Sequence, residues 1–186
     1  MNTLKNDDAR KFALAHHGDQ MYGDKPYSYH LDAVAKLVSQ YSLAHEGEEK
    51  CALDLAYLHD VVEDTYCTLS KIESHFGTFV RDCVHLLTDE PGANRKARKK
   101  ATYAKLKAVP LNSPLTVAHV VKACDRMANL AEALSDRNKS ILSMYAAEDK
   151  AFSDCLYGRV PTQVRNDLEG MMVTVRAVLA REYLGN

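Results

Sequence analysis

Four side chains that can bind metals or transfer protons lie close together in an otherwise apolar segment. The segment LAYLHDVVEDT, residues 55–65, begins with apolar and aromatic residues and then contains His59, Asp60, Glu63 and Asp64. In one continuous helix, residues four positions apart share a face, so His59 is expected beside Glu63 and Asp60 beside Asp64. Burying unpaired charges is costly, whereas a cation among them would be the largest local charge and would reverse that cost. Imidazole and carboxylate groups together suit manganese, iron, zinc or magnesium.

Two other segments can supply the further ligands that a divalent ion needs. His30 follows an irregular stretch and begins the amphipathic segment HLDAVAKLVSQY. Asp125 lies among small and apolar residues in VVKACDRMANL, where a carboxylate needs a partner. Lys122, Asp125 and Asn129 are spaced i, i+3 and i+7, so one helix face offers a metal ligand, an anion-binding ammonium group and an amide. The basic run at 95–100 is a further source of positive charge for a polyanion.

Helices are expected to position all of these residues, because apolar side chains recur at helical spacing and show no strand-like alternation. Thr68, Thr78 and Ser113 are expected N-caps, and Gly77 is an expected helix end. Asp7 or Asp8 is the expected cap of a first helix that reaches His17. The other expected helices cover residues 30–41, 46–62, 69–76, 78–87, 113–134, 141–157 and 161–183.

The bulk composition is that of one globular domain. The chain has 186 residues, of which 46% are hydrophobic and 26% are charged. No repeat, low-complexity tract or linker divides it. We therefore expect a single all-α domain over residues 1–186, a bundle of about eight to ten helices. The C-terminal helix, 162–183, is expected to pack on the rest.

Charge, hydropathy and cysteine content exclude several kinds of partner. The net charge of −1 gives no overall attraction to nucleic acids or membranes. No run approaches the roughly 20 apolar residues of a membrane span, and the N-terminal segment has early acidic residues in place of a signal peptide's apolar stretch. The five scattered cysteines form no CxxC pair, which favours reduced thiols. We expect a cytoplasmic protein that binds a small molecule, with no membrane or specific nucleic-acid partner.

The order of these motifs resembles that of a known enzyme family. His30, then His59-Asp60, then Asp125 follow the H…HD…D order of the HD-domain metal-dependent phosphohydrolases. The resemblance is closer to the hydrolase domains of RelA/SpoT-type enzymes and to their single-domain relatives, the small alarmone hydrolases. It covers residues 9–152, and four motifs in order are far more specific than the HD pair alone. These motifs are PYSYH at 26–30 (PYxxH), LHDVVEDT at 58–65 (LHDxxEDT), FG at 76–77 with LLTDE at 86–90 (FG…vT), and KACDRMANL at 122–130 (KlaDrlxNl).

The resemblance implies an all-α metalloenzyme with one divalent ion, a manganese ion. In that family, carboxylates at the positions of Glu63 and Asp64 act on the attacking water. Residues at the positions of Lys122 and Asn129 contact the nucleotide. The implied reaction removes the 3′-pyrophosphate from (p)ppGpp. The metal ligands that it implies are His30, His59, Asp60 and Asp125.

The resemblance also implies partners for the chain. Single-domain relatives act as antitoxins that degrade the product of a toxic alarmone synthetase. Pairing with such a synthetase, or with a second copy of the chain, is therefore an expectation.

The sequence departs from the family pattern beside the first motif. Met21 stands where the family has an arginine that stacks on guanine, Asp19 replaces a glutamine, and Leu31 replaces a proline. A methionine can pack against a base but lacks the charge of a guanidinium group, and Lys25 is the neighbouring residue that could supply it. The nucleobase therefore stays open. The alternatives are an HD phosphatase acting on an adenosine alarmone, a 5′-mononucleotide or NADPH, or a non-catalytic nucleotide-binding module.

Overall fold

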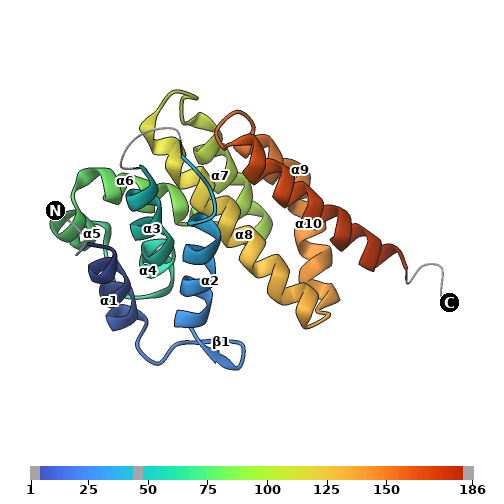
Figure 1. The fold of residues 1–186 in the computed structure, drawn as a ribbon, viewed down its shortest axis with the longest axis horizontal. Coiled ribbons are helices and arrows are strands. Elements are labelled where there is room, and N and C mark those ends of the chain that lie inside the picture. Colours follow the sequence, from blue (N-terminus) through green and yellow to red (C-terminus); the bar gives the residue numbers. More distant parts are fainter. Residues whose placement is uncertain (1–4, 44–47, 182–186) are drawn as a thin grey trace.

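Helices form most of the computed structural model, which describes residues 5–43 and 48–181 (Figure 1). A short 3-10 turn, Pro114–Thr116, precedes α8. The all-α fold predicted from the sequence is confirmed. In chain order, the helices are α1 (Lys5–His17), α2 (Ser28–Val38), α3 (Glu48–Leu58), α4 (Val61–Asp64), α5 (Leu69–Phe76), α6 (Thr78–Leu87), α7 (Arg95–Ala108), α8 (Val117–Ser135), α9 (Lys139–Leu156) and α10 (Thr162–Ala180).

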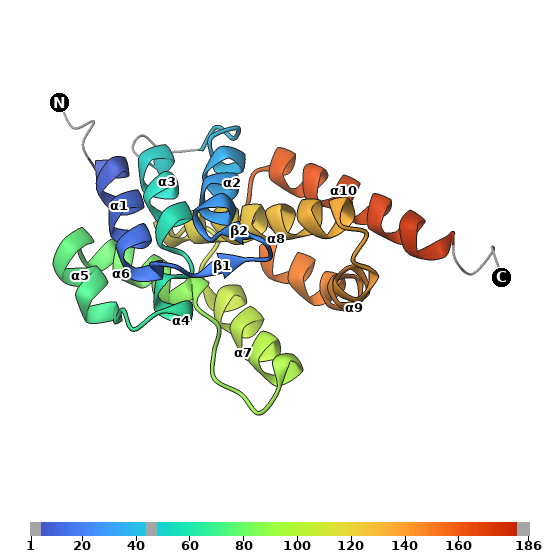
Figure 2. The ribbon, with the colours of Figure 1, turned by 90° about the horizontal axis from the view of Figure 1, so that it is seen from below.

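The helix α8 runs through the middle of the bundle (Figures 1 and 2). It packs against α2 and α3 on one side, against α9 and α10 on the other, and also against α6. Of its 19 residues, 13 are buried, as expected of a helix that packs against several others. A charged side chain on α8 therefore points either into the core or into a cavity between the surrounding helices.

The last helix, α10, packs on α8 and α9. Its C-terminal part extends past its neighbours in both views of the ribbon (Figures 1 and 2). The predicted end of this helix, Tyr183, lies outside the described residues. No helix in the part of the chain that the structure describes is both long and apolar enough to cross a membrane.

Two of the predicted N-caps are confirmed. The Thr68 hydroxyl oxygen accepts a hydrogen bond from the backbone N–H of Lys71 at 3.2 Å. The Ser113 hydroxyl oxygen accepts one from Leu115 at 3.2 Å, at the entrance to α8. Both bonds satisfy donors that the first turn of a helix leaves without a partner.

The other predicted N-caps are wrong, whereas Gly77 ends α5 as predicted. Gly77 is the single residue between α5 and α6. It is therefore the N-cap of α6, and Thr78 already belongs to that helix. The Thr78 hydroxyl instead donates to Glu73 at 2.9 Å. The helix α1 includes Asp7 and Asp8, so neither can be its N-cap.

The helix predicted over residues 46–62 is interrupted at His59 and Asp60, two of the predicted metal ligands. The predicted start at Glu46 lies outside the described residues, α3 ends at Leu58, and the four-residue α4 begins only at Val61. His59 Nδ1 donates to the carbonyl of Ala56 at 2.7 Å, which is the acceptor that the N–H of Asp60 would need in a continuing helix. His59 and Asp60 therefore occupy a turn, and the predicted stacking of both pairs on one helix face is wrong.

A small hairpin leads into α2 and was not predicted. The strands β1 (Met21–Tyr22) and β2 (Lys25–Pro26) pair antiparallel, with Met21 opposite Pro26 and Tyr22 opposite Lys25. Gly23, at φ 62°, occupies the turn in a conformation that favours glycine. Strands of two residues are too short to show alternating hydrophobicity, so the sequence carries no periodic signal for them.

Candidate metal centre and active site

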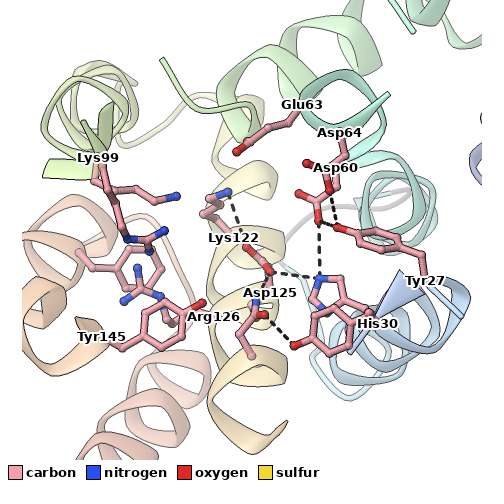
Figure 3. Close-up of a pocket in the computed structure, with 14 residues that line it drawn as sticks. Tyr27, His30, Asp60, Glu63, Asp64, Lys99, Lys122, Asp125, Arg126 and Tyr145 are labelled. Carbon is pink, nitrogen blue, oxygen red and sulfur yellow. Dashed lines mark hydrogen bonds and ion pairs between the residues drawn. The ribbon is translucent and has the colours of Figure 1, made fainter. Parts of the chain in front are cut away.

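Four side chains from three parts of the fold meet at one point beside α8, and Figure 3 shows three of them, His30, Asp60 and Asp125. The nearest approach is 2.9 Å, between His59 Nε2 and Asp60 Oδ2. His30 Nε2, from α2, lies 3.3 Å from His59 Nε2, 3.6 Å from Asp60 Oδ2 and 3.4 Å from Asp125 Oδ1. Asp125 Oδ1, from α8, lies 3.8 Å from His59 Nε2. The structure therefore brings together the four residues that the sequence analysis names as metal ligands.

The chemistry of these donors fits a divalent cation. Because His59 donates from Nδ1 to Ala56, its Nε2 is the ring nitrogen that faces the Nε2 of His30, and loss of the Nε2 proton would leave a lone pair there for a cation. Two imidazole nitrogens this close need a proton or a cation between them. Ligands at about 2.1 Å from an ion are roughly 3.0–3.4 Å from one another, and the separations seen here spread around that range. One ligand atom each from His30, His59 and Asp60 lies within 4.8 Å of the others, so they form a candidate metal site to which Asp125 adds a carboxylate.

The charges at this point also favour a cation. Burial alone would lower the pKa of His59, but the carboxylates of Asp60 and Asp125 outweigh it and raise the pKa to about 9. Burial would raise the pKa of both carboxylates, yet each is lowered, Asp60 by His59 and Asp125 by Lys122. Both carboxylates therefore stay ionised, and a cation that replaced the proton of His59 would lie beside two negative charges.

A second layer of hydrogen bonds orients the ligands. Asn129, one turn along α8, donates its side-chain amide to Asp125 Oδ1 at 2.6 Å and accepts from the Tyr22 hydroxyl at 2.8 Å. The Tyr27 hydroxyl lies 2.6 Å from Asp60 Oδ2. Asn129, which the sequence analysis assigns to the nucleotide, is thus also the partner of a proposed ligand. Partners of this kind fix the orientation and basicity of the ligands themselves.

Glu63 and Asp64 line the same cavity from α4 (Figure 3). Both residues are exposed, and neither is among the ligand atoms described above. The Glu63 carboxylate accepts the backbone N–H of Asp89 at 2.9 Å, and partial removal from water raises its pKa. Asp64 Oδ2 accepts from the Tyr27 hydroxyl at 2.8 Å and from the Gln20 amide at 3.2 Å. These two carboxylates can act on a water or a substrate in the cavity.

The opposite wall of the cavity is cationic. Arg95 and Lys99 reach it from α7, and Lys122 and Arg126 reach it from α8. Lys122 is buried, donates to the carbonyl of Leu87 at 2.9 Å and lies 3.6 Å from Asp125 Oδ2. Figure 3 shows Lys99 and Arg126 across the cavity from the carboxylates. An anion bound between the two walls would meet the candidate metal site on one side and basic groups on the other.

No family model matches the chain. Two proteins named guanosine-3′,5′-bis(diphosphate) 3′-pyrophosphohydrolase MESH1, from Homo sapiens and Xenopus tropicalis, are each 35% identical over 128 residues, which are 66% of this chain and 66% of the relative. The chain belongs to the SpoT-like HD hydrolases. The matched stretch spans just under two thirds of the length of these relatives.

More distant relatives of this SpoT-like chain extend the comparison. A guanosine-3′,5′-bis(diphosphate) 3′-pyrophosphohydrolase from Haemophilus influenzae is 30% identical over 117 residues, which are 62% of this chain and 16% of that longer protein. The solved structure of a metazoan ortholog of SpoT that hydrolyses ppGpp superposes with a TM-score of 0.76 at 22% identity, over 94% of this chain and 97% of that one. This second likeness shows that the fold continues beyond the stretch matched in sequence.

Two predicted substrate contacts of this SpoT-like chain lie away from the metal cavity. Met21 is 54% exposed on β1 and does not line the cavity. Lys25 donates to Glu132 at 2.5 Å, and its ammonium group lies 4.0 Å from the centre of the Tyr29 ring. Contact of Met21 and Lys25 with a nucleotide therefore stays a prediction.

Several cavity residues were not predicted individually. Arg95 and Lys99 are spaced i, i+4, so they share a face of α7, and this spacing was the available signal within the basic run. Arg126 follows Asp125, but its environment comes from α9, where the rings of Tyr145 and Phe152 each lie 4.2 Å from its guanidinium carbon. No local pattern in the sequence reveals that contact. The tyrosines of the cavity are likewise placed there by distant parts of the chain.

Proposed function

We propose that the chain is a divalent-cation-dependent pyrophosphohydrolase that removes the 3′-pyrophosphate from (p)ppGpp. The observation that carries this proposal is the cavity in which four ligand atoms, two further carboxylates and a cationic wall face one another. The printed names of the MESH1 relatives support the same reaction. Pairing with an alarmone synthetase or with a second copy of the chain stays a prediction, as does a cytoplasmic location.

The four converging residues would hold the ion, and we propose manganese. Two imidazoles and two carboxylates, with no thiolate among them, suit manganese better than they suit a soft metal ion. When bound, the ion supplies a water of lowered pKa and neutralises charge that develops on the phosphoryl group. The proposed ligands are His30, His59, Asp60 and Asp125.

Glu63 and Asp64 orient the attacking water and accept its proton in this proposal. They are the carboxylates in the cavity that lie beyond the ligand set, on a helix that begins directly after Asp60. Each is anchored by a separate hydrogen bond, Glu63 to the loop after α6 and Asp64 to residues before α2. A positioned carboxylate within reach of a water is the requirement for general base catalysis.

The cationic wall binds the phosphate groups of the substrate. Burial and the nearby charge of Lys122 lower the pKa of Lys99, so an anion at this wall stabilises both ammonium groups. Arg95 and Arg126 add guanidinium groups that can make paired contacts to phosphate oxygens. Donors placed where charge develops on the departing pyrophosphate favour its release.

The nucleoside would occupy a second cavity that adjoins the first. The two cavities share Tyr22, Asn129 and Tyr145, and the second is also lined by Ile141 and Met144 from α9. Aromatic and apolar side chains of this kind can stack on any base. Met21, next to Tyr22 on β1, lines neither cavity and carries no charge, so an adenosine alarmone is the second candidate substrate.

Product analysis tests the proposal. Purified protein with Mn²⁺ is incubated with ppGpp and, separately, with its adenosine counterpart ppApp, and pyrophosphate and orthophosphate are measured independently. We expect pyrophosphate from ppGpp, and none from an Asp125→Ala control. Pyrophosphate from ppApp alone would show that the adenosine alarmone, and not ppGpp, is the substrate. Release of orthophosphate only, from these compounds, a 5′-mononucleotide or NADPH, would refute pyrophosphohydrolysis.

A further inference from the structure

We propose that Tyr27 is a positioning residue that fixes the carboxylate of Asp64 relative to that of Asp60, a proposed metal ligand. This inference rests on the proposed function. The hydroxyl oxygen of Tyr27 lies 2.6 Å from Asp60 Oδ2 and 2.8 Å from Asp64 Oδ2. One phenol group therefore bridges the carboxylate assigned to the ion and the carboxylate assigned to the water (Figure 3). The hydroxyl has one proton, which it can donate to either carboxylate, and no other side-chain donor in the described residues lies within hydrogen-bond distance of both.

The surroundings of Tyr27 fix its hydroxyl in place. Tyr27 stands at the N-terminal boundary of α2 and is 8% exposed. Its ring stacks on His17, with centroids 4.3 Å apart and planes at 19°, and meets His30 edge-on at 5.8 Å. A side chain that is packed on two faces loses little further freedom when it makes a hydrogen bond. The hydroxyl is thus held rigidly between the two carboxylates, with one proton to donate to either of them.

A second tether acts on the same oxygen of Asp64. The Gln20 amide donates to Asp64 Oδ2 at 3.2 Å, and its own carbonyl oxygen accepts from His17 Nδ1 at 2.9 Å. Both donors meet Oδ2, and no donor from the described part of the chain reaches Oδ1. Oδ1 is therefore the Asp64 oxygen that can meet a water in the cavity.

The helix α4 needs such a tether. It has four residues, and a single helical turn is only marginally stable by itself. Asp64 is its last residue and is exposed, so its carboxylate would otherwise exchange among rotamers. Glu63 is anchored differently, through the backbone N–H of Asp89. Removal of the Tyr27 hydroxyl should therefore affect Asp64 and Asp60 and leave the Glu63 anchor intact.

Tyr27→Phe removes the hydroxyl and keeps the packed ring. The matched control is Tyr41→Phe, because Tyr41 is also buried and donates to a carboxylate, Asp167 at 2.9 Å, between α2 and α10. The affinity for Mn²⁺ is measured first, by calorimetry and without substrate. We expect about tenfold weaker binding in Tyr27→Phe, in the range typical of ligand partners, and unchanged binding in Tyr41→Phe. Equal Mn²⁺ affinity in wild type and Tyr27→Phe would overturn the link to Asp60.

Turnover of ppGpp at saturating Mn²⁺ tests the link to Asp64. We expect kcat of Tyr27→Phe to fall about ten- to a hundredfold with KM nearly unchanged, whereas a general loss of structure would affect both and would lower the unfolding temperature. In an Asp64→Asn background the same change should have little further effect, because Tyr27 acts through Asp64. Wild-type kcat in Tyr27→Phe, or an equal further loss in that background, would overturn the inference. An inactive wild type would refute the proposed function, and the Mn²⁺ affinities would still decide the role of Tyr27.

Discussion

Asp125 is the proposed ligand that joins the central helix to the ion. We expect Asp125→Ala to abolish turnover and also the thermal stabilisation that Mn²⁺ gives the wild type, which is about 2.7 kcal/mol at a hundredfold excess over Kd. Thermal unfolding with and without Mn²⁺ measures this. Glu63→Ala is the matched variant, because it removes a cavity carboxylate that is not a proposed ligand. It should keep the Mn²⁺ shift and lose turnover, and full activity with bound metal would show that Glu63 does not act on the water.

His119 should make the fold sensitive to acid. It is fully buried, its Nε2 lies 3.0 Å from the carbonyl of Leu106, and burial lowers its pKa. Below about pH 6.5 the unfolded chain protonates this histidine before the folded state does. The stability that neutral His119 contributes is therefore complete above about pH 6.5 and is lost as the pH falls toward its lowered folded value.

Urea unfolding at about pH 7.5 and pH 5.5 measures this effect. We expect the free energy of unfolding of His119→Gln to fall less between these pH values than that of the wild type, by up to about 1.4 kcal/mol per pH unit. Exposed His85 is the control, and His85→Gln should keep the wild-type slope. Equal slopes for wild type and His119→Gln would show that folding does not lower the pKa of His119.

At the residue scale, the sequence predicted which side chains come together better than it predicted what surrounds each of them. The order H…HD…D indicated which four side chains meet, and the structure places their ligand atoms close together. The role of Tyr27 was not foreseen, because its partners come from α1 and α4, and hydrogen bonding of tyrosine has no spacing signal. Arg126 was missed for the same reason, since its aromatic neighbours lie on α9.

At the element scale, Gly77 decides how α5 passes into α6. Its φ of 88° and ψ of 168° belong to a region that is essentially restricted to glycine. A Cβ added there meets no atom within 4 Å, so backbone strain is the whole cost of Gly77→Ala. We expect the free energy of unfolding to fall by about 1–3 kcal/mol.

Gly170 is the matched control for that substitution. It lies within α10, and a Cβ added there also meets no atom within 4 Å. Because alanine is the better helix former, Gly170→Ala should raise the free energy of unfolding by about 0.5–1 kcal/mol. Urea denaturation measures both variants. Effects of the same sign would contradict this assignment of backbone roles.

Elements were predictable where local chemistry decides them. Hydroxyl caps at Thr68 and Ser113 were recognised because the capping bond is made within three residues. The break after Leu58 was not recognised, because it depends on the orientation of one imidazole, and His59 in a continuing helix would give the same apolar pattern. The boundary between α3 and α4 is thus set by the side chain that also faces the candidate metal.

At the scale of the whole molecule, one ionic network connects the cationic wall to the bundle. Glu148 on α9 accepts from Arg95 on α7 at 2.7 Å, from Arg126 on α8 at 3.1 Å and from the Tyr103 hydroxyl at 3.2 Å. We expect Glu148→Gln to raise KM for ppGpp about tenfold through misplaced guanidinium groups, and to change kcat less. The next carboxylate, Asp149, pairs with Arg176 on α10, so Asp149→Asn should keep the wild-type KM. Steady-state kinetics of both variants test this, and equal KM values would contradict it.

We propose that hydrolysis depends on a cation held at the meeting point of α2, the turn after α3, and α8. The most direct measurement is pyrophosphate release from ppGpp by wild-type protein stripped of metal with a chelator, before and after Mn²⁺ is added back. We expect no release from the stripped protein and recovery of turnover with Mn²⁺. An undiminished rate in protein shown to be free of metal would contradict the claim.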